Sequence, residues 1–123
     1  MPVVEPIFTL EDLQRLIDAS HRCLVWVFKH SLTCSVSSAA LHEFHTFVGE
    51  QPAGSEAIYG LIEIQTAPGV SSALSERTAV LHESPQTLLL NGGAAVWHAS
   101  HLDITRESLD RAAELPSSSP AGA

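Results

Sequence analysis

One stretch, residues 24–37, constrains the fold of this chain more than any other. It opens with an unbroken apolar run, residues 24–28, whose β-branched and aromatic side chains predict a strand buried on both faces. After a mostly polar turn, Cys34 stands at the start of an apolar pattern with helical spacing. Free backbone N–H groups and the positive end of the helix dipole meet at such a junction. Both stabilise a thiolate, so we expect Cys34 to be a nucleophile.

Length and charge limit the classes of function. A chain of 123 residues predicts one domain. Six basic against fourteen acidic side chains give a net charge of −8, which argues against binding to nucleic acid or to an anionic membrane surface. The sequence has no apolar run of transmembrane length, and its first residues show no signal-peptide pattern. We therefore expect a cytoplasmic protein.

The two cysteines are predicted to have separate roles. Cys23 starts the apolar strand and Cys34 lies beyond its far end. Five strand residues separate these ends by about 16 Å. A disulfide tolerates Cα atoms only up to about 7 Å apart, so we expect no bond between these thiols. Cys23 is predicted to be a small buried hydrophobic side chain.

The pattern along the chain predicts a mixed sheet between helices. Helices are expected at about residues 10–20, 35–48, 68–81 and 106–115, with Thr9 and Thr105 as N-caps and with Leu10 on the buried face of the first helix. Strands are expected at residues 23–28 and 57–64, followed by a hairpin turning at residues 91–93. The first two strands should be parallel because a helix joins them. This order predicts an α/β, thioredoxin-like fold with a four-stranded sheet over residues 1–115 and a disordered tail over residues 116–123.

Cys34 and Ser37 form a C-x-x-S motif at the predicted helix start. A dithiol redox protein has a second cysteine in place of Ser37, and that thiol resolves a mixed disulfide. The hydroxyl of Ser37 cannot form a disulfide, but it can donate a hydrogen bond to a Cys34 thiolate. The motif alone fits an ordinary helix-start cysteine equally well. The buried strand before it and the Ser84-Pro85 pair after it favour the redox interpretation.

Ser84-Pro85 stands directly before the predicted hairpin. In a thioredoxin-like fold this proline would be cis and would pack beside the thiol, whereas an ordinary trans proline could also open a strand. The backbone of Ser84 would then offer its N–H and C=O to an extended substrate. We expect Thr33 and Ser35, which flank Cys34, to contact substrate as well.

Two basic side chains precede the cysteine. Lys29, the single lysine, lies at the end of the apolar strand, and His30 follows it. Both are candidates for tuning the thiol. As an imidazolium, His30 would lower the pKa of the thiol; the alternative is that it only completes the loop. The chain has seven histidines but neither an H-E-x-x-H motif nor a Cys pair, so no metal site is predicted.

Three separated segments of the chain occur together in one known family. They are Phe28-Lys29-His30-Ser31 with Thr33-Cys34 and Ser37, then His82-Glu83-Ser84-Pro85-Gln86, then Val96-Trp97-His98-Ala99-Ser100-His101 with Asp103-Ile104-Thr105. The chain thereby resembles the YtxJ-like monothiol bacilliredoxins over about residues 8–114. Ser35 and Val36 depart from the proline and isoleucine that the family typically has after the cysteine.

The resemblance implies a thiol–disulfide oxidoreductase that removes bacillithiol, a small glutathione-like thiol, from protein mixed disulfides. Cys34 would be the nucleophile, bacillithiol the co-substrate and S-thiolated proteins the partners, with no bound cofactor. Two other classes stay open: an iron–sulfur carrier resembling monothiol glutaredoxins, and a non-catalytic thioredoxin-like binding or stress protein. Against the first, Cys34 is not followed by Gly-Phe-Ser. The sequence predicts no oligomeric state.

Overall fold

The computed structural model describes residues 3–115, and the predicted disordered tail lies outside the described residues. Five strands, four α-helices and one short 3-10 helix follow one another along this part of the chain. In chain order they are β1 (Val4–Pro6), α1 (Leu10–Ala19), β2 (Val25–His30), α2 (Ser35–Gly49), β3 (Ile58–Glu63), α3 (Pro68–Thr78), β4 (Gln86–Asn91), β5 (Ala94–Ser100), η1 (His101–Asp103) and α4 (Arg106–Ala113). No described helix has the length and apolar character needed to span a membrane.

The sheet has the strand order β1-β3-β2-β4-β5, so β2 is the central strand. It pairs in parallel with β3 and antiparallel with β4, and β4 pairs antiparallel with β5. The prediction of a mixed sheet is confirmed, but the predicted strand count of four is wrong. The fifth strand is β1, a three-residue edge strand that pairs only with β3. Its formation depends on that distant partner, because three residues ending in Pro6 show no local strand pattern.

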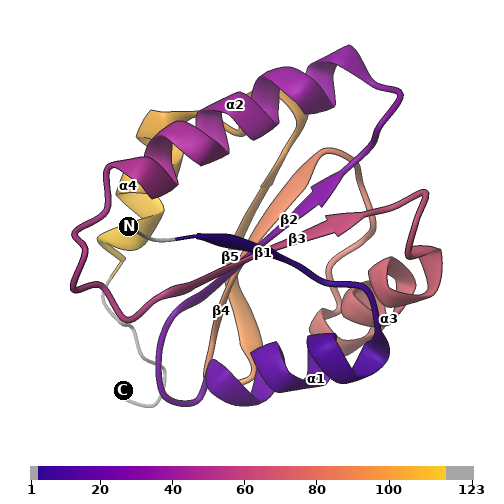
Figure 1. Ribbon diagram of the computed structural model, residues 1–123, viewed down its shortest axis with the longest axis horizontal. Coiled ribbons are helices and arrows are strands. Elements are labelled where there is room, and N and C mark those ends of the chain that lie inside the picture. The colour runs from indigo at the N-terminus through magenta and orange to yellow at the C-terminus, as the bar shows by residue number, and fades with distance from the viewer. Residues whose placement is uncertain (1–2, 116–123) are drawn as a thin grey trace.

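Helices cover both faces of the sheet: α2 and α4 lie on one face, and α1 and α3 on the other (Figure 1). The side chains of β2 alternate between the two layers. Val25 and Val27 pack in the core beneath α1 and α3, whereas Trp26 and Phe28 pack in the core beneath α2 and α4. Every residue of β2 is buried, which confirms the predicted strand with two covered faces. This three-layer arrangement is the predicted thioredoxin-like α/β class.

Several predicted boundaries differ from those observed. The central strand begins two residues later and ends two residues later than expected, so it includes Lys29 and His30. Both residues have ladder partners on β3, which keep the strand regular past its apolar run. α3 ends at Thr78, where Ala79 takes a left-handed conformation with φ 59°. Leu10 is 51% exposed and does not belong to the buried face of α1.

Side-chain caps and a glycine turn fix the ends of the elements, as predicted from the sequence. Thr9 caps α1 in a reciprocal capping box with Asp12, and Thr105 caps α4. The β4–β5 hairpin turns through Gly92 and Gly93, whose φ angles of +68° and +85° favour glycine. The backbone N–H groups of both glycines donate to Ser20, at the end of α1.

Candidate active site

Cys34 lies where β2 has ended and α2 begins. It is the N-cap residue of α2, and its side chain makes no capping hydrogen bond. The residue is partly exposed, and its carbonyl accepts the N–H of Ser38 in the first helical turn. The thiol therefore stands at the amino end of a 15-residue helix, within reach of solvent and of a disulfide partner. The predicted strand–turn–helix junction thus holds the cysteine in the structure.

Ser37 is fully buried, and its contacts differ from those expected. Its Oγ accepts the backbone N–H of Ser31 at 2.9 Å and lies 2.8 Å from Nδ1 of His30. No hydrogen bond joins Ser37 to Cys34 within residues 3–115. The hydroxyl therefore ties the first turn of α2 to the end of β2 and to the loop before Cys34.

His30 does not act as the imidazolium considered from the sequence. Its side chain lies in the core beneath α2 and is only 8% exposed. Burial lowers the pKa of His30, His45 lowers it further, and Glu63 opposes these effects. The ring is therefore neutral near pH 7. It contributes a hydrogen-bonding partner for Ser37 rather than a positive charge near the thiol.

Gln65 holds the loop before Cys34, a role that the sequence analysis missed. Its side-chain oxygen accepts the N–H of Leu32 at 3.0 Å, and its amide donates to Ser31 Oγ at 2.9 Å and to Thr33 Oγ1 at 3.4 Å. Thr33, a predicted substrate contact, is thus exposed but also anchored by this amide. A polar residue two positions after β3, the parallel neighbour of β2, is the signal that would have suggested this contact.

The Ser84–Pro85 peptide bond is cis, in agreement with the prediction. Pro85 is buried immediately before β4, whose first residue, Gln86, is the ladder partner of Lys29 near the end of β2. The Pro85 carbonyl accepts the N–H of His101 in η1. The Ser84–Pro85 segment therefore lies at the same edge of the sheet as the Cys34 loop. Ser35 is exposed in the first turn of α2 at this edge.

Lys29 lies in the layer opposite Ser37. Its side chain is fully buried, and burial lowers the pKa of Lys29 to about 8. The ammonium lies 2.8 Å from Ser75 Oγ on α3 and 3.3 Å from Nδ1 of His82. Lys29 thus contacts α3 and the segment before Ser84, and it makes no hydrogen bond to the Cys34 loop within the described residues. Ser75 was not singled out from the sequence, and His82 entered only as part of the segment that carries the family resemblance.

Both cysteines are free thiols in the structure. The Cys23 thiol donates to the carbonyl of Ala19 at 3.6 Å, and burial raises the pKa of Cys23. Across residues 3–115, no three His, Cys, Asp or Glu side chains gather into a group that would hold a metal ion. Cys23 is partly exposed, as Cys34 is, so the prediction that Cys23 is buried is wrong. The two thiols differ in that Cys34 stands at a helix start and makes no side-chain capping hydrogen bond.

Comparison with known proteins agrees with this geometry. A solved structure described as a candidate oxidoreductase with a thioredoxin fold matches with a TM-score of 0.79 and 29% identity, covering 91% of this chain and 95% of that one. Two thioredoxins share the fold. That of Fasciola hepatica matches with a TM-score of 0.71 and 16% identity, covering 89% of this chain and 95% of that one. That of Trypanosoma brucei brucei matches with a TM-score of 0.70 and 14% identity, covering 92% of this chain and 93% of that one. The model of the monothiol bacilliredoxin family BrxC matches residues 5–109. The chain therefore belongs to the monothiol bacilliredoxin BrxC family of thioredoxin-fold thiol oxidoreductases.

Proposed function

We propose that this protein removes bacillithiol, or a similar small thiol, from protein mixed disulfides through a Cys34 nucleophile, and that it acts in the cytoplasm. The observation that carries the proposal is the position of Cys34: a partly exposed, uncapped thiol at the start of α2, three residues before a buried serine instead of a second cysteine. Family membership supplies the class of reaction. S-thiolated proteins and the free small thiol are the two reaction partners.

The reaction consists of two thiol–disulfide exchanges. In the first, the Cys34 thiolate attacks the small-thiol sulfur of the mixed disulfide. A new disulfide joins Cys34 to the small thiol, and the target protein leaves as a thiolate that takes a proton from solvent. In the second, another small-thiol thiolate attacks the small-thiol sulfur carried on Cys34. This step releases Cys34 and a symmetric small-thiol disulfide, so the one added small thiol is the reductant for the target thiol.

The contacts around Cys34 support this one-cysteine route. Ser37 and Gln65 hold the loop before Cys34 from two sides, so the thiol is presented on a fixed backbone. Cys23 lies before β2, at the opposite end of the central strand, and cannot resolve a disulfide on Cys34 without disrupting the sheet. Discharge therefore requires a second molecule of thiol.

Ser84 is the proposed docking position for the target protein. Its backbone makes no hydrogen bond within residues 3–115, and it lies at the same edge of the sheet as Cys34. An extended target segment would pair with the free N–H and C=O of Ser84. Thr33 and Ser35, both exposed beside the thiol, would contact the same segment or the small thiol.

The test uses a model protein carrying bacillithiol on a single cysteine. Intact mass should show bacillithiol transferred to Cys34 and then released when free bacillithiol is added. Cys34→Ser should abolish the transfer, and Cys23→Ser should retain it. An internal disulfide as the main oxidised species, or an unreactive Cys34, would overturn the proposal. An oxygen-labile chromophore on the purified protein would instead favour an iron–sulfur carrier.

A further inference from the structure

The ammonium of Lys29 is a buried positive charge whose contacts are all neutral. Its hydrogen-bond partners are the hydroxyl of Ser75 and the ring of His82, and no carboxylate forms an ion pair with it in the described part of the chain. Burial is the only cause that shifts its pKa, to about 8, so the group remains mostly protonated at pH 7. A buried cation without a counter-ion favours an anion nearby.

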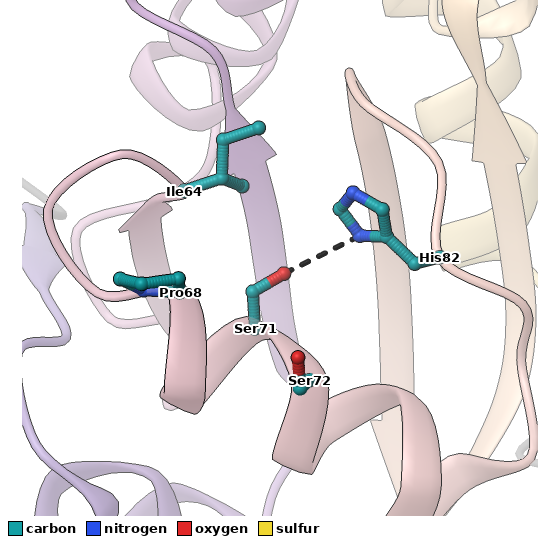
Figure 2. A pocket seen from close by; sticks show the side chains of 5 residues that line it. All are labelled: Ile64, Pro68, Ser71, Ser72 and His82. Atoms are coloured by element: carbon teal, nitrogen blue, oxygen red, sulfur yellow. Dashed lines mark hydrogen bonds between the residues drawn. The ribbon is translucent and has the colours of Figure 1, made fainter.

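A cavity of about 220 Å³ is lined in part by His82, the ring that Lys29 contacts, while Lys29 itself is not among the lining residues. It is lined by Ile64, Pro68, Ser71, Ser72 and His82, and Figure 2 shows these side chains surrounding it. Pro68, Ser71 and Ser72 belong to the first turns of α3, which carry no acidic residue. The lining thus combines two hydroxyls and one imidazole with a small apolar wall. Its volume suits a small polar group rather than a large ligand.

Lys29 also fixes the hydrogen-bonding character of His82. An ammonium has only donors, so the ring nitrogen facing it, Nδ1, must be an acceptor and the proton of neutral His82 lies on Nε2. Burial and the charge of Lys29 lower the pKa of His82, against the opposing effect of Glu83. Figure 2 shows Nδ1 directed at Ser71 on α3 and the other ring nitrogen directed away from this helix. His82 therefore keeps an Nε2–H donor that neither Lys29 nor Ser71 occupies.

We infer that this cavity is an anion subsite for a carboxylate of the small thiol that reacts at Cys34. The inference rests on the proposed function, because it concerns the same co-substrate. The hydroxyl of Ser72, the Nε2–H of His82 and the field of Lys29 favour a negative group there, while the Ser71 hydroxyl donates to His82 Nδ1. Small thiols such as bacillithiol and glutathione carry carboxylates, so one of these groups would occupy the cavity while the sulfur reacts.

The cavity and the thiol lie at the same edge of the sheet. Ile64 follows β3 directly, and its N–H donates to the carbonyl of His30 at the end of β2. The next residue, Gln65, holds the loop before Cys34. On the other side of the cavity, His82 is two residues before the proposed docking position, Ser84. Two residues that line the cavity are therefore close in sequence to the segments around the thiol: Ile64 precedes Gln65, and His82 is two residues before Ser84.

The experiment compares disulfides that differ in charge. The rate at which reduced protein forms a mixed disulfide at Cys34 is measured with bacillithiol disulfide, with glutathione disulfide and with the neutral 2-hydroxyethyl disulfide. Ser72→Asp adds one negative charge to an exposed lining position. Gly54→Asp adds the same charge to an exposed loop before β3, at the other end of the sheet, where an added Cβ meets no atom within 4 Å.

Ser72→Asp should slow the reaction with the anionic disulfides by about fivefold, which corresponds to roughly 1 kcal/mol. The rate with the neutral disulfide should stay within about twofold of the wild-type rate. Gly54→Asp should preserve the wild-type ratio between the rates with the anionic disulfides and the rate with the neutral disulfide. Equal effects of Ser72→Asp on both classes would overturn the inference. A second outcome would also overturn it: added phosphate shifts the amide resonances of Ser71 and Ser72, but the Ser72→Asp rates show no dependence on the charge of the disulfide. The cavity would then bind a free oxyanion and not the carboxylate of the reacting thiol. If Cys34 reacts with none of the disulfides, the proposed function itself fails.

Discussion

Ser37 Oγ lies 2.8 Å from His30 Nδ1, and both side chains are buried. The same oxygen accepts the N–H of Ser31. Ser37→Ala would leave a buried backbone donor and a ring nitrogen without their partner. We expect this variant to lower the free energy of unfolding by about 1–3 kcal/mol. Urea unfolding of the reduced protein measures the change.

Ser35→Ala is the matched control for that measurement, because Ser35 is exposed in the same helical turn. Its stability should stay within about 0.5 kcal/mol of the wild type. If Ser37→Ala proves equally mild, the buried contacts of Ser37 contribute nothing measurable, and its function would have to lie elsewhere.

The two thiols should react at different rates with an alkylating agent. Burial raises the pKa of Cys23, and its thiol donates to the Ala19 carbonyl. Cys34 has no such hydrogen bond and stands at a helix start. Limiting iodoacetamide near pH 7 should therefore label Cys34 first, as peptide mapping would show. Preferential labelling of Cys23 would contradict the assignment of the nucleophile.

Lys29 should make stability depend on pH above neutrality. Burial lowers its pKa from 10.5 to about 8. Between these values the unfolded chain holds a proton that the folded protein has lost, so stability rises with pH across this window. Relative to Lys29→Met, the wild-type free energy of unfolding should rise by roughly 2 kcal/mol between about pH 8 and pH 10. Parallel pH profiles for the two proteins would show that the pKa of Lys29 is not lowered.

Gly60 occupies a position on β3 where a larger residue would clash. An added Cβ would lie 2.6 Å from Ile7 Cδ1 and 3.1 Å from Leu16 Cδ1, and both of these side chains are buried. Gly60→Ala should therefore destabilise the protein by about 1–3 kcal/mol in urea unfolding.

Gly49 provides the control for Gly60. It is the last residue of α2, and an added Cβ would meet no atom within 4 Å. Gly49→Ala should leave stability unchanged or raise it by up to about 1 kcal/mol, because alanine favours a helix. If both alanine variants behaved alike, the close approach of Ile7 to Gly60 would not limit this position.

The elements with strong local patterns could be predicted from the sequence, and those that depend on distant partners could not. α2 was expected within one residue because its apolar period and its start at Cys34 are local signals. β1 was missed because it is short and becomes a strand only by pairing with β3. The extension of β2 through Lys29 and His30 was missed because their polar atoms find partners 46 and 7 residues away.

The same distinction holds at the site. The position of Cys34 follows from a junction that the local sequence specifies. The partners of Ser37 depend on how the backbone turns between Ser31 and Cys34, which residue types alone do not determine. Gln65 and His82 come from neighbouring segments of the fold, so no spacing around Cys34 indicated them.

The central place of β2 has a consequence for local opening of the protein. All six of its residues are buried and it is hydrogen-bonded on both sides, so its amides should exchange with solvent only when the whole domain unfolds. Cys34 lies four residues after the end of this protected strand, yet it is partly exposed. A reagent in solvent can therefore reach its sulfur without any opening of the hydrogen bonds that hold β2 in the sheet.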